Sequence, residues 1–254
     1  MSRVIAAVDS SAAARPVLDT AAALARLLGA ELAALHVRED GDFTPRAQAG
    51  AVGVPLRTVR GPTVPSLVEA AKPDDVVAMV LGARGTPAGR RPAGRTALEV
   101  AAVLPKPLVI VPPSLAHPGR LRRLLVPLDG SATTAAALRG TIEFARGCAL
   151  EVVVLHVRDE ASLPPFEDQP QHETASWAHE FVARHCPCPP EELQLEVRVG
   201  SPPDYVVRVA VEADVDLVAL GWSQDLSEGR AAVVRETLAK SAVPVLLVPI
   251  VSGA

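Results

Sequence analysis

The sequence predicts an α/β protein built from two tandem Rossmann-like domains, each an open five-stranded, mainly parallel sheet with helices on both faces. Three observations lead to this prediction. Apolar residues make up 49% of the 254 residues and aromatic residues only 3%, so the core must consist of Ala, Val and Leu. Short apolar strands alternate with helical segments, which is typical of parallel strands buried between helices. The same order of elements occurs twice along the chain.

The first repeat begins with an apolar strand at residues 4–9, which ends in the helix N-cap signal Asp-Ser-Ser. The helix that follows has apolar residues at helical spacing and ends near Gly29. A strand at residues 32–38 contains the run Leu-His-Val-Arg. Residues 76–81 read as a buried strand before a glycine-rich loop, and residues 107–112 as the last strand.

The second repeat matches the first at a constant offset that changes once. Asp9 corresponds to Asp129 at an offset of 120 residues, and Gly82 corresponds to Gly221 at an offset of 139. The second repeat therefore carries an insertion of 19 residues between its second and third strands. We expect a helix at residues 173–185 of this insertion, and only a short polar connection at residues 39–52 of the first repeat.

The repeat predicts two domains, at residues 1–113 and 120–254, joined by a short linker. In the strand order of a known family that the chain resembles, the last strand of each domain is an edge of its sheet, and proteins cover exposed apolar edges. We therefore expect the two edges to face each other as an intramolecular pseudo-dimer. Homodimer formation and an unidentified protein partner remain open.

Composition argues against several classes of function. The net charge of −4 speaks against a general nucleic-acid binder. The sequence shows neither a signal peptide nor an apolar run of membrane-spanning length, so a cytoplasmic protein without a membrane role is expected. Cys186 and Cys188 lack the second ligand pair of a zinc site, and no metal site is predicted.

The stretch from Leu81 to Thr96 is the strongest candidate for a binding site. It joins a buried strand to a helix and is rich in glycine, so that backbone N–H groups and the positive end of the helix can face an anion. Its four arginines add cationic hydrogen-bond donors. Because ligands of open parallel sheets lie where the strand order reverses, Asp9 and Gly82 are expected to face one crevice.

These features resemble the universal stress protein family in its tandem form, whose domains have the adenine nucleotide alpha hydrolase-like fold. Members that bind ATP carry a Gly-x2-Gly-x9-Gly-(Ser/Thr) loop. The first two glycines match Gly82 and Gly85, whereas the third, Gly94, arrives one residue early. The residues that the resemblance assigns to the nucleotide are Ala7, Val8, Asp9, Val37, Leu81, Gly82, Arg84, Gly85, Gly94, Arg95 and Thr96.

The resemblance implies that Asp9 and Val37 flank the adenosine and that the loop residues hold the ribose and phosphates. ATP, with or without Mg²⁺, is the expected ligand of the first domain. The second domain has Gln224 in place of the second glycine, and two carboxylates in its loop, so no nucleotide is expected there. Gln224→Ala is accordingly expected to leave binding unchanged.

Two alternatives remain beside the nucleotide-binding regulator. One is a nucleotide-independent interaction module of the same fold, and the other is an enzyme of the same superfamily, such as an adenylating ligase. No catalytic residues are predicted, and ATP hydrolysis is expected to be weak at most. Asp129 is interpreted as a helix cap, the paired residues His36 and His156 as packing residues, and the arginines around Arg123 as a solvated strand start.

Overall fold

The computed structural model describes ten strands and seven helices. The described residues are 1–9, 11, 14–38, 50, 53–83, 94–113, 115, 120–158, 170–189, 192–225, 227 and 231–250, and for residues 170–175 only the backbone is described. The expected polar connection at residues 39–52 lies outside these ranges except for Gly50.

The strands and helices follow the predicted repeat. The first half contains β1 (Arg3–Ala7), α1 (Ala14–Leu28), β2 (Glu31–Arg38), β3 (Leu56–Arg60), α3 (Thr63–Ala71), β4 (Val76–Gly82), α4 (Arg95–Val103) and β5 (Leu108–Val111). The second half contains β6 (Arg123–Pro127), α5 (Ala132–Gly147), β7 (Glu151–Arg158), α6 (Pro170–His185), β8 (Gln194–Val199), α7 (Pro202–Glu212), β9 (Leu217–Trp222), α8 (Ala232–Lys240) and β10 (Val245–Pro249). The helix expected in the insertion is α6, which begins three residues earlier than predicted.

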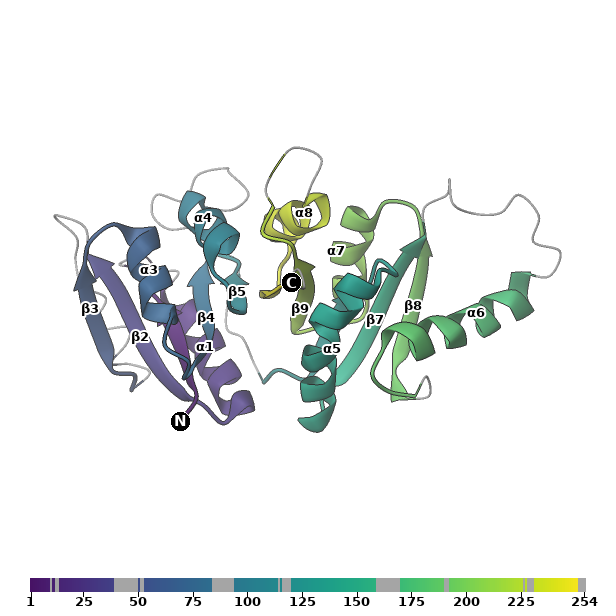
Figure 1. Cartoon of the computed structure of the whole chain (residues 1–254), viewed down its shortest axis with the longest axis horizontal. Coiled ribbons are helices and arrows are strands. Elements are labelled where there is room, and N and C mark those ends of the chain that lie inside the picture. The colour runs from purple at the N-terminus through teal and green to yellow at the C-terminus, as the bar shows by residue number, and fades with distance from the viewer. Residues whose placement is uncertain are drawn as a thin grey trace.

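All ten strands form one sheet in the order β3-β2-β1-β4-β5-β10-β9-β6-β7-β8. Neighbouring strands within each half are parallel, and β5 pairs with β10 in antiparallel orientation where the halves meet (Figure 1). The last strands of the two repeats therefore lie side by side, as expected. In the first half the strand order reverses between β1 and β4, which are direct neighbours. The carboxyl ends of β1 and β4 thus border the predicted crevice.

Side chains pack in two core clusters, one on each face of the sheet. Helices α1, α5 and α6 contribute to one cluster, and α3, α4, α7 and α8 contribute to the other. Each cluster contains buried residues of both halves; Ile5 of β1 and Leu125 of β6 belong to the same one. Packing is therefore continuous across the β5–β10 pair.

The turns after β3 and β8 show that the repeat extends to the backbone. Gly61 and Gly200 have φ values of 145° and 133°, a range that side-chain-bearing residues rarely adopt. An added Cβ would lie 3.0 Å from Ser66 at the first turn and 3.1 Å from Tyr205 at the second. Both turns thus need glycine for the same reason.

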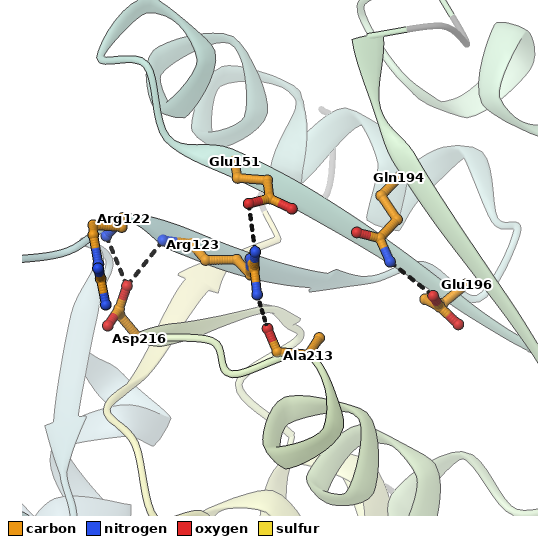
Figure 2. A network of polar contacts seen from close by, with 7 residues as sticks. All are labelled: Arg122, Arg123, Glu151, Gln194, Glu196, Ala213 and Asp216. Carbon is orange, nitrogen blue, oxygen red and sulfur yellow. Dashed lines mark hydrogen bonds and ion pairs between the residues drawn. The ribbon is translucent and has the colours of Figure 1, made fainter.

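A polar network joins the amino ends of three strands in the second half (Figure 2). The Asp216 carboxylate accepts hydrogen bonds from the backbone N–H groups of Arg122 and Arg123, at 2.7 and 2.9 Å. The Arg123 guanidinium pairs with Glu151 at 2.7 Å and donates to the carbonyl of Ala213 at the end of α7. The expected solvated strand start is confirmed for Arg120 and Arg122, which are exposed. It is wrong for Arg123, whose side chain ties β6 to β7 and α7.

Candidate functional site

The predicted crevice lies at the carboxyl ends of β1, β2 and β4. Ala7 is paired with Leu35 on one side and with Leu81 on the other. The Val8 N–H donates to the carbonyl of Leu35 at 2.9 Å, so the chain continues along β2 before it turns into α1. Val37, two residues beyond Leu35 in β2, is also buried. These residues form the apolar floor of the crevice.

A histidine fixes the turn after the first strand in each half. His36 Nδ1 is 2.9 Å from the carbonyl oxygen of Val8, and His156 Nδ1 is 2.8 Å from that of Leu128. His36 is buried, with 2% of its surface exposed. The repeated contact supports the packing interpretation and gives it a purpose, since it sets the path of the segment that carries the strand-one aspartate.

The two strand-one aspartates are engaged differently. Asp129 accepts from the Ser131 N–H through Oδ1 and from the Thr134 hydroxyl through Oδ2, at 2.9 and 3.2 Å. Asp9 accepts both of its hydrogen bonds, from the N–H and hydroxyl of Ser11, through Oδ1. The counterpart of Thr134 is Ala14, which has no hydroxyl. Oδ2 of Asp9 thus has no partner among the described residues.

The cap of α5 is Ser131, whose Oγ accepts from the Thr134 N–H at 3.1 Å. Interpreting Asp129 as the cap was therefore wrong by two residues. Asp129 instead supports the turn that presents Ser131, and Ser131 satisfies an N–H group of the first helical turn.

The amino end of α4 forms the other wall of the crevice. The Ala83 N–H donates to the Val111 carbonyl at 2.7 Å, and the Gly94 N–H donates to the Ala83 carbonyl. The loop therefore returns to the end of β4 before the helix starts. Gly94 is the N-cap residue and provides no side-chain hydrogen bond. Among the described residues, no side chain caps the first N–H groups of α4, and such groups can bind an anion.

The remaining predicted site residues are placed less uniformly. Arg84 and Gly85 lie outside the described residues. Thr96 is exposed in the first turn of α4. Arg95 forms an ion pair with Glu99 on its own helix at 2.6 Å, and its hydrogen bond to this carboxylate raises the pKa of the Arg95 guanidinium. To contact a ligand, the Arg95 side chain has to leave Glu99.

In the second half, side chains occupy the space beside Gly221, the counterpart of Gly82. An added Cβ on Gly221 would lie 3.2 Å from Thr134 Cγ2 and 3.5 Å from Ile250 Cδ1. Gln224 has a φ of 60°, so this turn uses the left-handed conformation that a glycine would adopt without strain. Thr134 and Ile250 thus occupy the space beside Gly221, and Gln224 adopts a conformation that favours glycine.

Two side chains of this loop contact the first half, which the sequence did not predict. Trp222 Nε1 donates to the Ala101 carbonyl of α4 at 2.7 Å. Gln224 Nε2 donates to the Leu104 carbonyl at 2.8 Å, with a longer contact of 3.4 Å to Ala101. The available signal was a tryptophan and a glutamine in place of Ala83 and Gly85, in a chain with only two tryptophans.

The described residues contain no group of three or more His, Cys, Asp or Glu side chains that could hold a metal ion. Cys186 is buried, and burial is the main cause that raises the pKa of its thiol to about 11. Burial also raises the pKa of Cys188. Within the same part of the chain, no helix has the length and apolar character needed to cross a membrane.

The sheet order, the crevice at the reversal and the repeat define a tandem Rossmann-like α/β protein. The model of the universal stress protein family matches residues 120–249, which is more than half of the chain. The chain belongs to the universal stress protein family. A search of curated proteins gives no match.

Two of the similar solved structures cover nearly the whole chain and show the same fold. A functionally unknown protein from Pseudomonas aeruginosa PAO1 is 13% identical, with 98% of this chain and 92% of that chain covered and a TM-score of 0.71. A universal stress protein from Archaeoglobus fulgidus DSM 4304 is 17% identical, with 98% of both chains covered and a TM-score of 0.66. A universal stress protein from Archaeoglobus fulgidus, solved in complex with dAMP, covers 50% of this chain and 97% of its own length, at 23% identity and a TM-score of 0.34.

Proposed function

We propose that this chain is a universal-stress-type regulatory protein that binds ATP or another adenine nucleotide in its first half. The observation that carries the proposal is the pair of opposing groups across the first-half crevice. Asp9 offers a carboxylate oxygen without a partner among the described residues, and α4 offers an amino end without a side-chain cap. A nucleotide has ribose hydroxyls that donate to a carboxylate and phosphates that accept from N–H groups.

The proposed pose follows from the order of these groups. Val37 and Val8 provide apolar surface for the base, beside the carboxylate of Asp9 for the ribose. The phosphates run along Gly82 toward the first turn of α4, where Gly94, Arg95 and Thr96 meet them. Arg84 and Gly85 complete the phosphate loop in this proposal, with Arg84 adding a charged donor. When ATP is bound with Mg²⁺, the ion sits on the phosphates rather than on a protein cluster.

We assign the protein a binding role and only weak ATP hydrolysis. Fast hydrolysis requires a positioned water and a base near the γ-phosphate. Asp9 lies at the ribose end of the proposed pose, away from that phosphate. A protein that binds the nucleotide without consuming it can report its presence through a change in conformation or stability.

Titration calorimetry of the full chain with ATP tests the proposal, together with native mass spectrometry of the purified protein. One nucleotide per chain is expected. Gly85→Val should abolish binding, because the loop could no longer approach the phosphates closely. Arg84→Ala should weaken binding by roughly ten- to a hundredfold, the effect of one charge-assisted hydrogen bond.

Ser223→Ala is the matched control for Arg84→Ala, because Ser223 occupies the equivalent position of the second-half loop. This variant should bind ATP like the wild type. Two equivalent sites per chain, or a loss of binding in Ser223→Ala, would contradict a first-half site. Absence of ATP binding would reject the proposal in favour of an interaction module that works without a nucleotide.

A further inference from the structure

The second-half loop holds the carboxyl end of α4, the helix whose amino end faces the first-half crevice. Trp222 is the last residue of β9 and is only 2% exposed. Its indole N–H and the amide of Gln224 donate to Ala101 and Leu104 at the end of α4. These hydrogen bonds join the second half to a wall of the candidate site.

The recipient carbonyls belong to a helix end that needs external partners. The last four carbonyls of a helix have no partner within it, and Ala101 belongs to this group in α4. At the matching end of α8, the C-cap residue Ser241 uses its Oγ for the N–H and the carbonyl of Val243, beyond the helix, at 3.2 and 2.7 Å. The end of α4, by contrast, accepts hydrogen bonds from two side chains of the other half.

The conformation of Gln224 shows that the contact carries a cost. A φ of 60° is unfavourable for a residue with a Cβ. Glycine, which occupies the matching position 85, would remove this cost but could not reach α4. Gln224 therefore adopts a strained backbone conformation, and its side chain forms hydrogen bonds to the first half.

Because α4 is short, a contact at its carboxyl end also affects the position of its amino end. α4 has nine residues, and at a rise of 1.5 Å per residue it spans about 13 Å. Its residues Ala97, Val100 and Ala101 are buried in the core, and their packing holds the helix as one rigid element. Fixing its carboxyl end against Trp222 and Gln224 also fixes where its first N–H groups stand relative to Gly82.

We propose that Trp222 and Gln224 are positioning residues for the first-half site, so that the second half sets the affinity of the first for its nucleotide. This inference rests on the proposed function and adds to it the means of control. It also assigns a role to the second-half loop, which lacks the second glycine of a phosphate-binding loop and instead contacts and orients α4. Linkage makes the coupling reciprocal, so a bound nucleotide should in turn tighten the junction.

The test compares Gln224→Gly with the wild-type full chain by two measurements. Glycine accepts the positive φ, so this variant removes the hydrogen bonds without adding backbone strain. Amide hydrogen exchange of the free protein should be faster in α4 and unchanged in α1. Calorimetry with ATP should show binding at least fivefold weaker, and ATP should slow exchange in α4 less than it does in the wild type.

Arg123→Met serves as the control for a general loss of stability, because it removes contacts to Glu151 and Ala213, both in the second half, and none to α4 among the described residues. It should keep the wild-type affinity for ATP. Wild-type affinity in Gln224→Gly would overturn the positioning role while leaving nucleotide binding intact. Equal weakening in Arg123→Met would also overturn it, by showing that stability alone controls affinity. A wild-type chain that binds no nucleotide would overturn both proposals.

Discussion

The carboxyl edges of the two halves present the same backbone plan with different side chains. Both have an aspartate two residues beyond the first strand and a glycine at the end of the fourth. In the first half, the matching positions are taken by Ala14 and Ala83, whose side chains are small and buried. In the second half, the Thr134 hydroxyl donates a hydrogen bond to Asp129, and the Thr134 methyl group lies beside Gly221.

This comparison shows that the fold provides the crevice and that a few side chains decide its use. The reversal of strand order exists in both halves, since β1 pairs with β4 and β6 pairs with β9. Replacing a glycine by Gln224 and an alanine by Trp222 turns one loop toward the neighbouring half. A repeat protein can in this way combine a binding unit and a supporting unit of equal architecture.

Trp222→Ala should have the largest effect on stability. The side chain is buried between the halves and donates to Ala101, so its removal leaves a cavity and an unpaired carbonyl. We expect a loss of about 3–5 kcal/mol in the free energy of unfolding, measured with urea. Trp177→Ala in α6 is the control and should cost less, because Trp177 is only half-buried. An equal or larger loss in Trp177→Ala would contradict the central role of the junction.

His36→Phe should cost about 1–3 kcal/mol, because it leaves the carbonyl of Val8 without its buried donor. His156→Phe removes the matching contact to Leu128 and should cost less, since His156 is half-buried and water can replace it. Thermal and urea unfolding of both variants gives the comparison. The reverse order of the two losses would contradict our account of how each turn is held.

Much of the fold could be predicted from the sequence because it depends on repeated apolar periodicity. The strands around Ile5 and Leu125 and the inserted helix followed from pattern and offset. The meeting of the last strands followed from the strand order that the family resemblance implies. Periodicity reports which face of an element is buried, and the constant offset made each half a check on the other.

The side-chain contacts across the junction could not be predicted in this way. Gln224 looked like a defect of a binding loop, because a single sequence does not show which groups face it. No role was predicted for Trp222 from the sequence. The expectation that Gln224→Ala is neutral did not take account of the carbonyls at the end of α4. Arg123 was misjudged for the same reason, since Ala213 comes near it only in the folded chain.

Arg123→Met should lower the stability by about 1–2 kcal/mol, because the guanidinium links Glu151 to the carbonyl of Ala213. Arg3→Met is its counterpart in the first half, where the side chain pairs with Asp75 at 2.9 Å. That pair is more than a third exposed on the arginine side, so its loss should cost less than about 1 kcal/mol. Urea unfolding compares the two variants, and a larger loss in Arg3→Met would contradict the difference between the two strand starts.

The smallest effect concerns pH and the inserted helix α6. Burial is the main cause that lowers the pKa of His185, with further lowering by Arg184 and His156 and an opposing contribution from Asp129. The folded state thus favours the neutral ring, which packs 4.7 Å from the Phe181 ring. The unfolded chain binds the proton more readily, so the stabilising contribution of His185 is complete above its ordinary pKa of about 6.5.

As the pH falls below that value, this contribution should be lost progressively through the lower folded-state pKa of His185. Urea unfolding at pH 7.5 and 5.5 should therefore show a greater loss of stability in the wild type than in His185→Asn, which cannot take up the proton. Most carboxylates remain ionised over this interval, so the difference between the two proteins isolates the histidine. The protection of the α6 amides, taken relative to the intrinsic exchange rate at each pH, should fall at pH 5.5, while the protection of the α1 amides stays constant. A wild type that gains stability relative to His185→Asn on acidification would show that protonation strengthens the packing of α6, contrary to the sign derived from burial.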